Sequence, residues 1–194
     1  HNDLDYFICE AGIGGKYDTT SIIQSKTVVL TSIGLDHIDI LGNKITDILD
    51  QKIYVSNNIK TLFVSVLKED LIEIIKSEYT NYSKSIFLSE YLNSKNISFS
   101  KLIFKDLNYY LSLMVVDLLL QGIKYSDLTN IKIKEAKGRF EIVNDSPVKI
   151  IDGAHNYEGV EILLRNYENK YGGLNTDIFL GFKKGKDINS ILNL

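Results

Sequence analysis

The sequence predicts an α/β protein with a mostly parallel sheet, and three observations support this. Short apolar runs rich in β-branched residues recur along the first part of the chain, as buried parallel strands require. Stretches with helical spacing lie between and after these runs. Glycine or polar residues follow the first two runs, where strands would end. The expected strands are residues 5–10, 26–33 and 61–66.

Helical stretches are expected between and after these strands. Two shorter ones cover residues 45–54 and 68–76. The clearest helix covers residues 104–121, because apolar residues fall on one face of it at steps of four, three and four, namely Leu107, Leu111, Met114 and Leu118. Gly122 is the expected stop. Residues 77–100 are rich in Ser, Asn and Tyr and predict no firm structure.

A second domain is predicted near the end of the chain. The only proline, Pro147, lies in the polar stretch 144–147. A strand at 148–152, a helix at 158–169 and a strand at 177–182 follow as a new strand–helix–strand unit. We therefore expect one domain over residues 1–144 and the first part of another over residues 145–194. Because the chain begins at His1 and both ends adjoin strand-like runs, we expect a fragment of a longer protein.

Composition restricts the possible partners. The net charge of −3 gives no electrostatic case for nucleic acid, and the lysines form no basic block for an anionic membrane. The longest apolar run, 111–120, contains Asp117 and is too short to span a bilayer. The single cysteine, Cys9, excludes an intrachain disulfide and fits a reducing cytosol. We expect a cytoplasmic protein that acts on small molecules, with no nucleic acid or membrane partner.

The first motif is a carboxylate followed by a glycine-rich turn. Glu10 ends a predicted buried strand, and residues 11–15 read Ala-Gly-Ile-Gly-Gly. Ligands of open α/β sheets bind at the carboxyl ends of strands, and glycines allow the backbone to approach them. A metal ion is a reasonable partner for a buried carboxylate. The alternative is a plain strand-to-loop turn, because glycine-rich signals of this kind are weak.

The second motif closes the next predicted strand with polar groups. Residues 31–39 read Thr-Ser-Ile-Gly-Leu-Asp-His-Ile-Asp, and Gly42 lies beyond. A neutral His37 could bind a divalent metal through one ring nitrogen. The alternative is a structural histidine that forms hydrogen bonds within the loop.

The third motif contains Arg139, which lies beside Gly138. The chain has only two arginines against twenty lysines, so this position suggests a need for the planar guanidinium fork. A bidentate grip on phosphate is the natural use, and an ordinary surface arginine is the alternative.

The fourth motif is Ile-Ile-Asp-Gly-Ala-His-Asn at residues 150–156. Asp152 could accept hydrogen bonds from ribose hydroxyls, and His155 or Asn156 could donate to phosphate. The alternative for Asn156 is a helix cap. Residues 181–187 have the wrong spacing for a Walker phosphate loop and lack its Ser or Thr.

The four motifs, in this order, resemble the folylpolyglutamate synthase and dihydrofolate synthase family of the Mur ligase superfamily. The family carries Glu-x-Gly-x-Gly-Gly-Arg-x-Asp-Ala-Thr-Asn, then Thr-Ser-Ile-Gly-x-Asp-His and Leu-Gly, then Gly-Arg and Asp-Gly-Ala-His-Asn. The matching positions are residues 10–21, 31–37, 41–42, 138–139 and 152–156. The resemblance implies a Mur ligase-type central ATPase domain followed by the start of a Rossmann-like C-terminal domain.

The resemblance also implies roles for residues of the first domain. Glu10 and His37 would bind magnesium, and His37 would lie at the catalytic centre. Lys52 matches a catalytic lysine that is carbamylated and supports the metal site. The pteroate part of the substrate would contact a further set, namely Tyr17, Asp18 and Thr19.

ATP would be held by four residues in this resemblance. Asn108 would touch the nucleotide and Arg139 its phosphates, while Asp152 and His155 would hold it from the C-terminal domain. Departures from the family pattern include Lys16 in place of Arg, and Thr19 and Ser21 in place of Ala and Asn.

The implied reaction uses ATP to phosphorylate a carboxylate of folate or dihydropteroate, and the amine of L-glutamate then attacks the acyl phosphate. The family's phosphate loop lies N-terminal to the Glu10 motif, so we expect the chain as given to be inactive and the intact protein to be an active monomer. Two alternatives stay open. One is a Mur ligase for peptidoglycan precursors, and the other is a non-catalytic nucleotide-binding paralogue.

Overall fold

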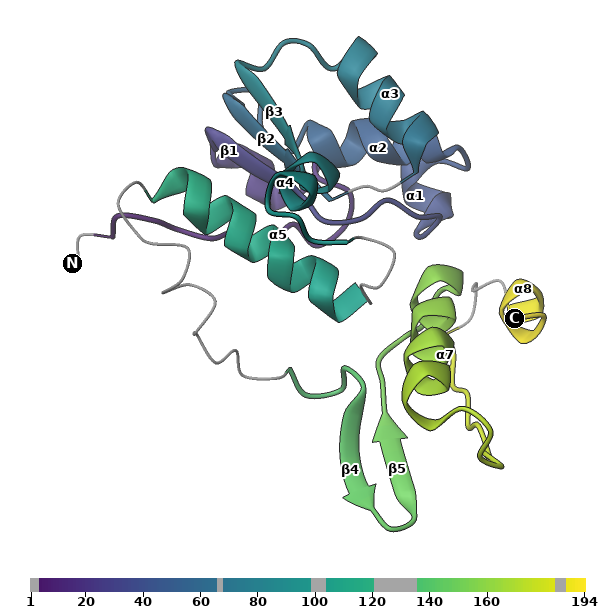
Figure 1. Cartoon of the computed structure of the whole chain (residues 1–194). Coiled ribbons are helices and arrows are strands. Elements are labelled where there is room, and N and C mark those ends of the chain that lie inside the picture. Colours follow the sequence, from purple (N-terminus) through teal and green to yellow (C-terminus); the bar gives the residue numbers. More distant parts are fainter. Residues whose placement is uncertain (1–3, 66–67, 99–103, 121–135, 184–187) are drawn as a thin grey trace. The chain divides into compact units, whose positions relative to one another are not determined.

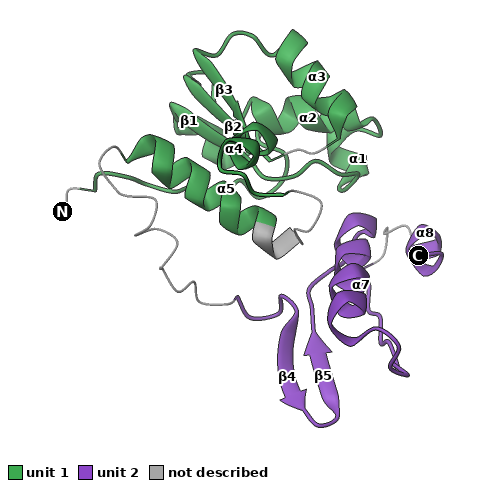
Figure 2. Cartoon of the chain, in the orientation of Figure 1, with its two compact units in different colours: residues 1–121 green, residues 122–194 purple. Residues whose placement is uncertain are grey.

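The computed structural model describes residues 4–65, 68–98, 104–120, 136–183 and 188–194. The chain forms two compact units, residues 1–121 and 122–194, which are described separately (Figure 2).

The first unit contains a parallel sheet of three strands. These are β1 (Thr27–Leu30), β2 (Thr61–Val64) and β3 (Lys84–Phe87), in the order β1-β2-β3 (Figure 1). The helices of this unit are α1 (Ile38–Leu41), α2 (Ile45–Ile53), α3 (Glu69–Glu78), α4 (Leu88–Ser94) and α5 (Phe104–Leu119). The predicted α/β class and parallel sheet are confirmed, and β3 and α4 form in the segment where the sequence predicted no firm structure.

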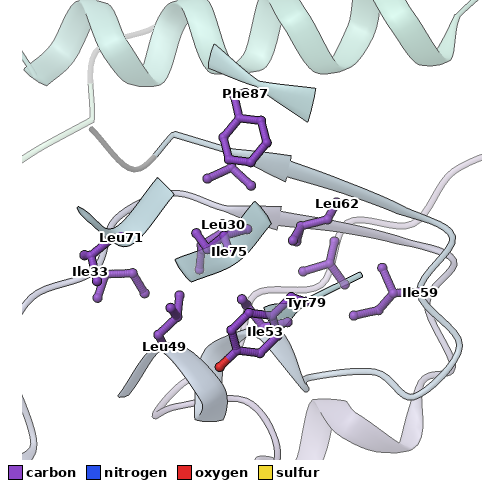
Figure 3. Close-up of a cluster of buried hydrophobic side chains, with 12 residues drawn as sticks. Leu30, Ile33, Leu49, Ile53, Ile59, Leu62, Leu71, Ile75, Tyr79 and Phe87 are labelled. Carbon is purple, nitrogen blue, oxygen red and sulfur yellow. The ribbon is translucent and has the colours of Figure 1, made fainter. Parts of the chain in front are cut away.

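The core of this unit lies between the sheet and helices α2 and α3 (Figure 3). Leu49 and Ile53 project from α2 at a spacing of four, which places them on one helical face. Leu71 and Ile75 do the same on α3. The strands add a further apolar set, which includes Val28, Leu30, Leu62, Val64 and Phe87. This packing fixes α2 against the sheet, and α2 carries one wall of the site described below.

Helix α5 packs on α4 through a buried face and a polar contact. Leu107, Leu111 and Met114 are buried as predicted, whereas Leu118 is 40% exposed, so the predicted apolar face ends one turn early. The Tyr91 hydroxyl donates to Asp117 Oδ2 at 2.8 Å. Gly122, the expected helix stop, lies outside the described residues.

The prediction of a strand over residues 5–10 is wrong. This segment has no regular structure, and Ile8 is 95% exposed. An apolar run forms a strand only where a neighbouring strand accepts its backbone hydrogen bonds. Within the described residues, none pairs with this segment.

The second unit contains an antiparallel pair of strands and two helices. Strands β4 (Glu141–Asp145) and β5 (Val148–Ile151) form a hairpin, followed by α7 (Tyr157–Tyr171) and α8 (Ile188–Leu192) (Figure 1). The Asn144 side-chain amide donates to the Pro147 carbonyl oxygen at 2.6 Å and closes the hairpin turn. The predicted division between residues 144 and 145 therefore falls inside this hairpin. The polar stretch 144–147 forms the end of β4 and the turn of the hairpin.

The prediction of a strand over residues 177–182 is also wrong, while the strand at 148–152 and the helix at 158–169 are confirmed by β5 and α7. Residues 177–182 have no regular structure, and Phe179 is 94% exposed. As with residues 5–10, no described strand pairs with this run. Among the described helices, none has the length and apolar character needed to cross a membrane.

Candidate ligand pocket and motif loops

The glycine turn packs its backbone directly against helix α2. The Lys16 N–H donates to the Gln51 carbonyl oxygen at 2.7 Å. A Cβ atom on Gly15 would lie 2.8 Å from the same oxygen and 2.9 Å from Val55 Cβ. Gly14 has a φ of 68°, and a Cβ there would lie 2.7 Å from Leu41 Cδ2. The close approach of the turn to α2 therefore requires glycine at position 15, and the positive φ favours glycine at position 14.

The Asp18 carboxylate holds the turn together with four hydrogen bonds. Oδ2 accepts from the N–H groups of Gly12 and Ile13 at 3.1 and 3.2 Å. Oδ1 accepts from the Thr20 N–H at 2.9 Å and the Thr20 hydroxyl at 2.8 Å. Hydrogen bonds to Thr20, and then to Ile13 and Gly12, stabilise the ionised carboxylate and lower the pKa of Asp18 to about 2. Asp18 therefore joins the residues before and after it into one hydrogen-bonded loop.

A pocket of about 300 Å³ opens beside this loop. It is lined by Ile13, Tyr17, Asp18, Thr19, Ile40, Leu41 and Gln51. The structure thus brings the predicted contacts Tyr17, Asp18 and Thr19 into one concave site. Gln51 and the aliphatic walls were not predicted from the sequence. Only their positions in the sequence could have pointed to them, because Leu41 lies in a motif that matches the family and Gln51 directly precedes Lys52.

A charged and aromatic cluster supports the loop. Lys16 Nζ lies 3.4 Å from Asp50 Oδ2, and 5.7 and 5.6 Å from the ring centroids of Tyr17 and Tyr54. The Tyr79 hydroxyl donates to Asp50 Oδ1 at 3.4 Å. Burial and the adjacent Asp50 carboxylate raise the pKa of Tyr79 above its usual range. Lys16, at the position where the family has arginine, therefore links the turn to α2.

The predicted metal ligands lie on exposed segments. Glu10 is in the irregular run before the glycine turn, and His37 precedes α1 with a φ of 51°. His37 Nε2 lies 3.9 Å from Asp36 Oδ2. No group of three or more His, Cys, Asp or Glu side chains that could hold a metal occurs among the described residues. Mg²⁺ often binds through only one or two protein ligands together with water and phosphate.

The other predicted site residues of the first unit are more widely placed. Lys52 is half-buried on α2, and its carbonyl oxygen would lie 3.1 Å from a Cβ on Gly15. Asn108 is exposed on α5. Lys52 therefore belongs to the helix that supports the glycine turn.

In the second unit, Asp152 joins two of the motifs. Its Oδ2 accepts from the Phe140 N–H and its Oδ1 from the Ala154 N–H, both at 2.7 Å. The Gly153 N–H donates to the Gly138 carbonyl oxygen at 2.8 Å. A Cβ on Gly153 would lie 2.8 Å from Arg139 Nη1, so the guanidinium lies against this glycine. The Gly-Arg turn and the Asp-Gly-Ala-His turn therefore form one structural unit.

The end of the fourth motif begins helix α7. The Asn156 side-chain oxygen accepts from the Gly159 N–H at 2.9 Å, so the helix-cap interpretation of Asn156 is confirmed. His155 is exposed, with Nδ1 lying 2.9 Å from the Gly153 carbonyl oxygen.

No protein-family profile matches the chain. Curated relatives do match it. A dihydrofolate synthase/folylpolyglutamate synthase of Bacillus subtilis is 26% identical over 217 aligned residues, which cover 97% of the chain and 50% of that protein. Its counterpart in Buchnera aphidicola from Schizaphis graminum is 30% identical over 172 residues, covering 79% of the chain and 40% of that protein. The chain thus spans about half the length of these relatives.

Solved structures of proteins with the same names have a similar fold. The Escherichia coli FolC protein in complex with DHPP and ADP has a TM-score of 0.62 and 20% identity over 94% of the chain and 48% of that protein. A bifunctional folylpolyglutamate synthase/dihydrofolate synthase with Mn, AMPPNP and L-glutamate bound has a TM-score of 0.59 and 19% identity over 82% of the chain and 42% of that protein.

The parallel sheet, its helices and the motif loops at the site define the class as a Mur ligase-type fold. Within that class, the chain is related to the folylpolyglutamate synthases and dihydrofolate synthases.

Proposed function

We propose that the protein carrying this chain is an ATP-dependent ligase that joins L-glutamate to folate, to dihydropteroate, or to both. Relatives with these two activities in their names match the chain over most of its length. The observation that carries the proposal is the pocket, because Tyr17, Asp18 and Thr19, the residues expected to contact pteroate, lie together in it.

The pocket has the chemistry that a flat ring system needs. Ile13, Ile40 and Leu41 supply aliphatic walls, and Tyr17 and Thr19 supply an aromatic ring and a hydroxyl. The Asp18 carboxylate already accepts four hydrogen bonds from its own loop. We therefore propose that Tyr17, Asp18 and Thr19 contact the substrate, and that Asp18 also holds the loop in shape.

We propose that the nucleotide is bound by Asn108, Arg139, Asp152 and His155, as the resemblance implies. The Arg139 guanidinium could bind phosphate oxygens in a bidentate manner, which a lysine could not. Asp152 acts by positioning, because both of its oxygens accept backbone N–H groups around Arg139. The exposed His155 supplies a ring beside the same turn.

Glu10 and His37 are the residues that would hold magnesium, with water and nucleotide phosphate completing its ligands. When bound, the ion would neutralise charge on the phosphates. We propose Lys52 as the lysine whose carbamylation supports this site. Its backbone already borders Gly15, so its side chain begins next to the glycine turn.

The reaction needs an activated carboxylate, because an ionised carboxylate is a poor electrophile. Its oxygen attacks the γ-phosphorus of ATP, the bond to the β-phosphate oxygen breaks, and ADP leaves. The glutamate amine then attacks the acyl carbon, loses a proton and displaces phosphate, which leaves an amide. Arg139 would bind the phosphoryl oxygens and stabilise the charge that develops on them.

We further propose that residues 1–144 belong to the central ATP-binding domain of the family, and that residues 145–194 form the first part of its C-terminal domain. Small molecules are the proposed partners, namely folate or dihydropteroate, L-glutamate and ATP. The protein is proposed to act as a monomer in the cytoplasm.

The test is incorporation of radiolabelled L-glutamate by the full-length protein that carries this chain. Folate, dihydropteroate and a nucleotide-linked muramyl peptide are supplied separately, each with and without ATP. We expect ATP-dependent incorporation with a pteroate compound. Incorporation only with the muramyl peptide, or with none of the three, would show that the proposal is wrong.

A further inference from the structure

We infer that Glu141 is a positioning residue for Arg139, and that it acts as a hydrogen-bond acceptor rather than as a charge. Its carboxylate bonds the backbone of the Gly-Arg turn, which leaves the Arg139 guanidinium to a phosphate ligand. This inference rests on the proposed function, in which Arg139 binds ATP phosphates, and it names a residue to which the family resemblance gives no role.

The antiparallel hairpin places Glu141 at the base of the Arg139 turn. Glu141 is the first residue of β4 and pairs with Ile151, the last residue of β5 (Figure 1). Asp152 follows Ile151 directly, so both carboxylates lie at the same end of the hairpin. Glu141 Oε2 accepts the Gly138 N–H at 2.7 Å in a partly buried contact. The hairpin register therefore delivers Glu141 to the residue that precedes Arg139.

The backbone has an unusual conformation on both sides of Arg139. Gly138 has a φ of 67° and Phe140 a φ of 47°. A bulky residue rarely adopts a left-handed conformation, and it persists there only where the surrounding structure holds it. The Phe140 N–H donates to Asp152 Oδ2, as the Gly138 N–H donates to Glu141. Each left-handed residue is therefore held through its N–H by one carboxylate.

The Arg139 guanidinium has no carboxylate partner in the part of the chain that the structure describes. An ion pair with a neighbouring carboxylate would occupy the N–H donors that bind phosphate oxygens. Glu141 and Asp152 bond backbone N–H groups instead. The turn thus holds two carboxylates beside an arginine and keeps the guanidinium donors available.

Charge and hydrogen bonding predict opposite effects of replacing Glu141. Loss of a negative charge near the site would by itself tighten the binding of an anionic nucleotide. Loss of the acceptor would leave the Gly138 N–H unpaired and allow the turn to move, which would weaken binding. Glu141→Met removes both the charge and the acceptor. Glu141→Gln removes the charge but keeps a carbonyl oxygen that can accept the same N–H.

The experiment measures binding of ATP, folate and dihydropteroate, each separately, to the full-length protein by calorimetry. We expect Glu141→Met to raise the dissociation constant of ATP about tenfold, and Glu141→Gln to restore it to within about twofold of the wild-type value. Binding of pteroate compounds should not change, because their proposed pocket belongs to the other unit. Asp145→Asn, which removes a carboxylate charge from an exposed position of the same strand, is the matched control and should not affect any of the three ligands.

A double variant tests whether Glu141 acts through Arg139. Arg139→Met alone should weaken ATP binding, and adding Glu141→Met to it should cause no further loss, because the turn then has no guanidinium to position. A further loss as large as that of Glu141→Met alone would show that Glu141 acts independently of Arg139 and would overturn the inference.

The remaining outcomes separate the inference from the function on which it rests. If the wild-type protein does not bind ATP, the proposed function and the inference are both overturned. If Arg139→Met weakens ATP binding while Glu141→Met binds ATP as tightly as the wild-type protein or more tightly, only the inference is overturned. Failure of Glu141→Gln to restore ATP binding would show that the charge is needed. Equal losses for ATP and the pteroate compounds would show a general structural role, and either result would also overturn the inference.

Discussion

The Lys16 ammonium group lies 3.4 Å from the Asp50 carboxylate and thereby ties the glycine turn to helix α2. The same ammonium lies over the Tyr17 ring, which is 81% exposed and forms part of the pocket wall. The ion pair is partly exposed, so its main effect should be on the position of Tyr17 rather than on overall stability.

Replacement of Lys16 should therefore affect binding more than folding. Lys16→Met removes the ion pair and the cation–π contacts, and we expect it to lower the free energy of unfolding by only about 0.5–1 kcal/mol. Folate or dihydropteroate should bind more weakly, because the Tyr17 ring loses its support. Lys16→Arg keeps the charge and should restore binding. Urea unfolding and calorimetry on the same samples test both expectations, and wild-type binding by Lys16→Met would contradict them.

Loss of the Asp18 charge should loosen the glycine turn. The folded-state pKa of Asp18 is lowered from 3.8 to about 2, so its stabilising effect is present above its unfolded pKa and is lost as pH falls toward 2. Asp18→Asn replaces one carboxylate oxygen by an NH2 group, which would set N–H donors against at least one backbone N–H group of the loop. The variant should bind pteroate compounds weakly at neutral pH.

The pH dependence supplies the check on Asp18. Unfolding free energies of the wild-type protein and Asp18→Asn are compared at pH 5 and near pH 2, a range that spans the ordinary pKa of 3.8 and reaches the lowered pKa of about 2. The difference between the two proteins should be larger at pH 5, because all other carboxylates are common to both. A difference that does not change with pH would show that the Asp18 charge does not hold the loop.

The close packing of the glycine turn predicts a position-dependent effect of alanine. Gly15→Ala would place a methyl group 2.8 Å from the Gln51 carbonyl oxygen, so the turn must move away from α2. We expect a loss of about 1–3 kcal/mol in unfolding free energy, as for other overpacked sites. Gly12→Ala is the matched control, because its methyl group would meet only Asp18 Oδ2 at an ordinary 3.4 Å. Equal stabilities of the two variants would contradict the observed packing.

The sequence predicted those elements whose pattern reflects their own packing. Helix α2 shows buried residues at helical spacing, and β1 and β2 read as apolar runs because helices cover the sheet. Residues 5–10 and 177–182 have the same apolar character without a strand partner. Local sequence does not distinguish a run that is paired from one that is not, because pairing depends on distant residues.

The pocket could be predicted only in part, because it also depends on contacts between residues that are distant in the sequence. Tyr17, Asp18 and Thr19 are adjacent in the sequence and belong to a motif. Gln51 reaches them because α2 packs against the glycine turn, and no spacing rule connects residues so far apart. The sequence also could not show that the carboxylates of Asp18 and Asp152 are committed to backbone N–H groups, since this depends on the folded shape of each loop.

Asp152 should act on the nucleotide through Arg139. Its carboxylate accepts the Phe140 N–H and the Ala154 N–H, and Asp152→Asn would set an N–H donor against one of them. We expect Asp152→Asn and Arg139→Met each to weaken ATP binding about tenfold without affecting pteroate compounds, as for loss of a charge-assisted hydrogen bond. If Asp152 works by holding the Arg139 turn, the double variant should bind ATP about as weakly as either single variant, because coupled residues are not additive. Additive losses would instead indicate that Asp152 contacts the nucleotide independently.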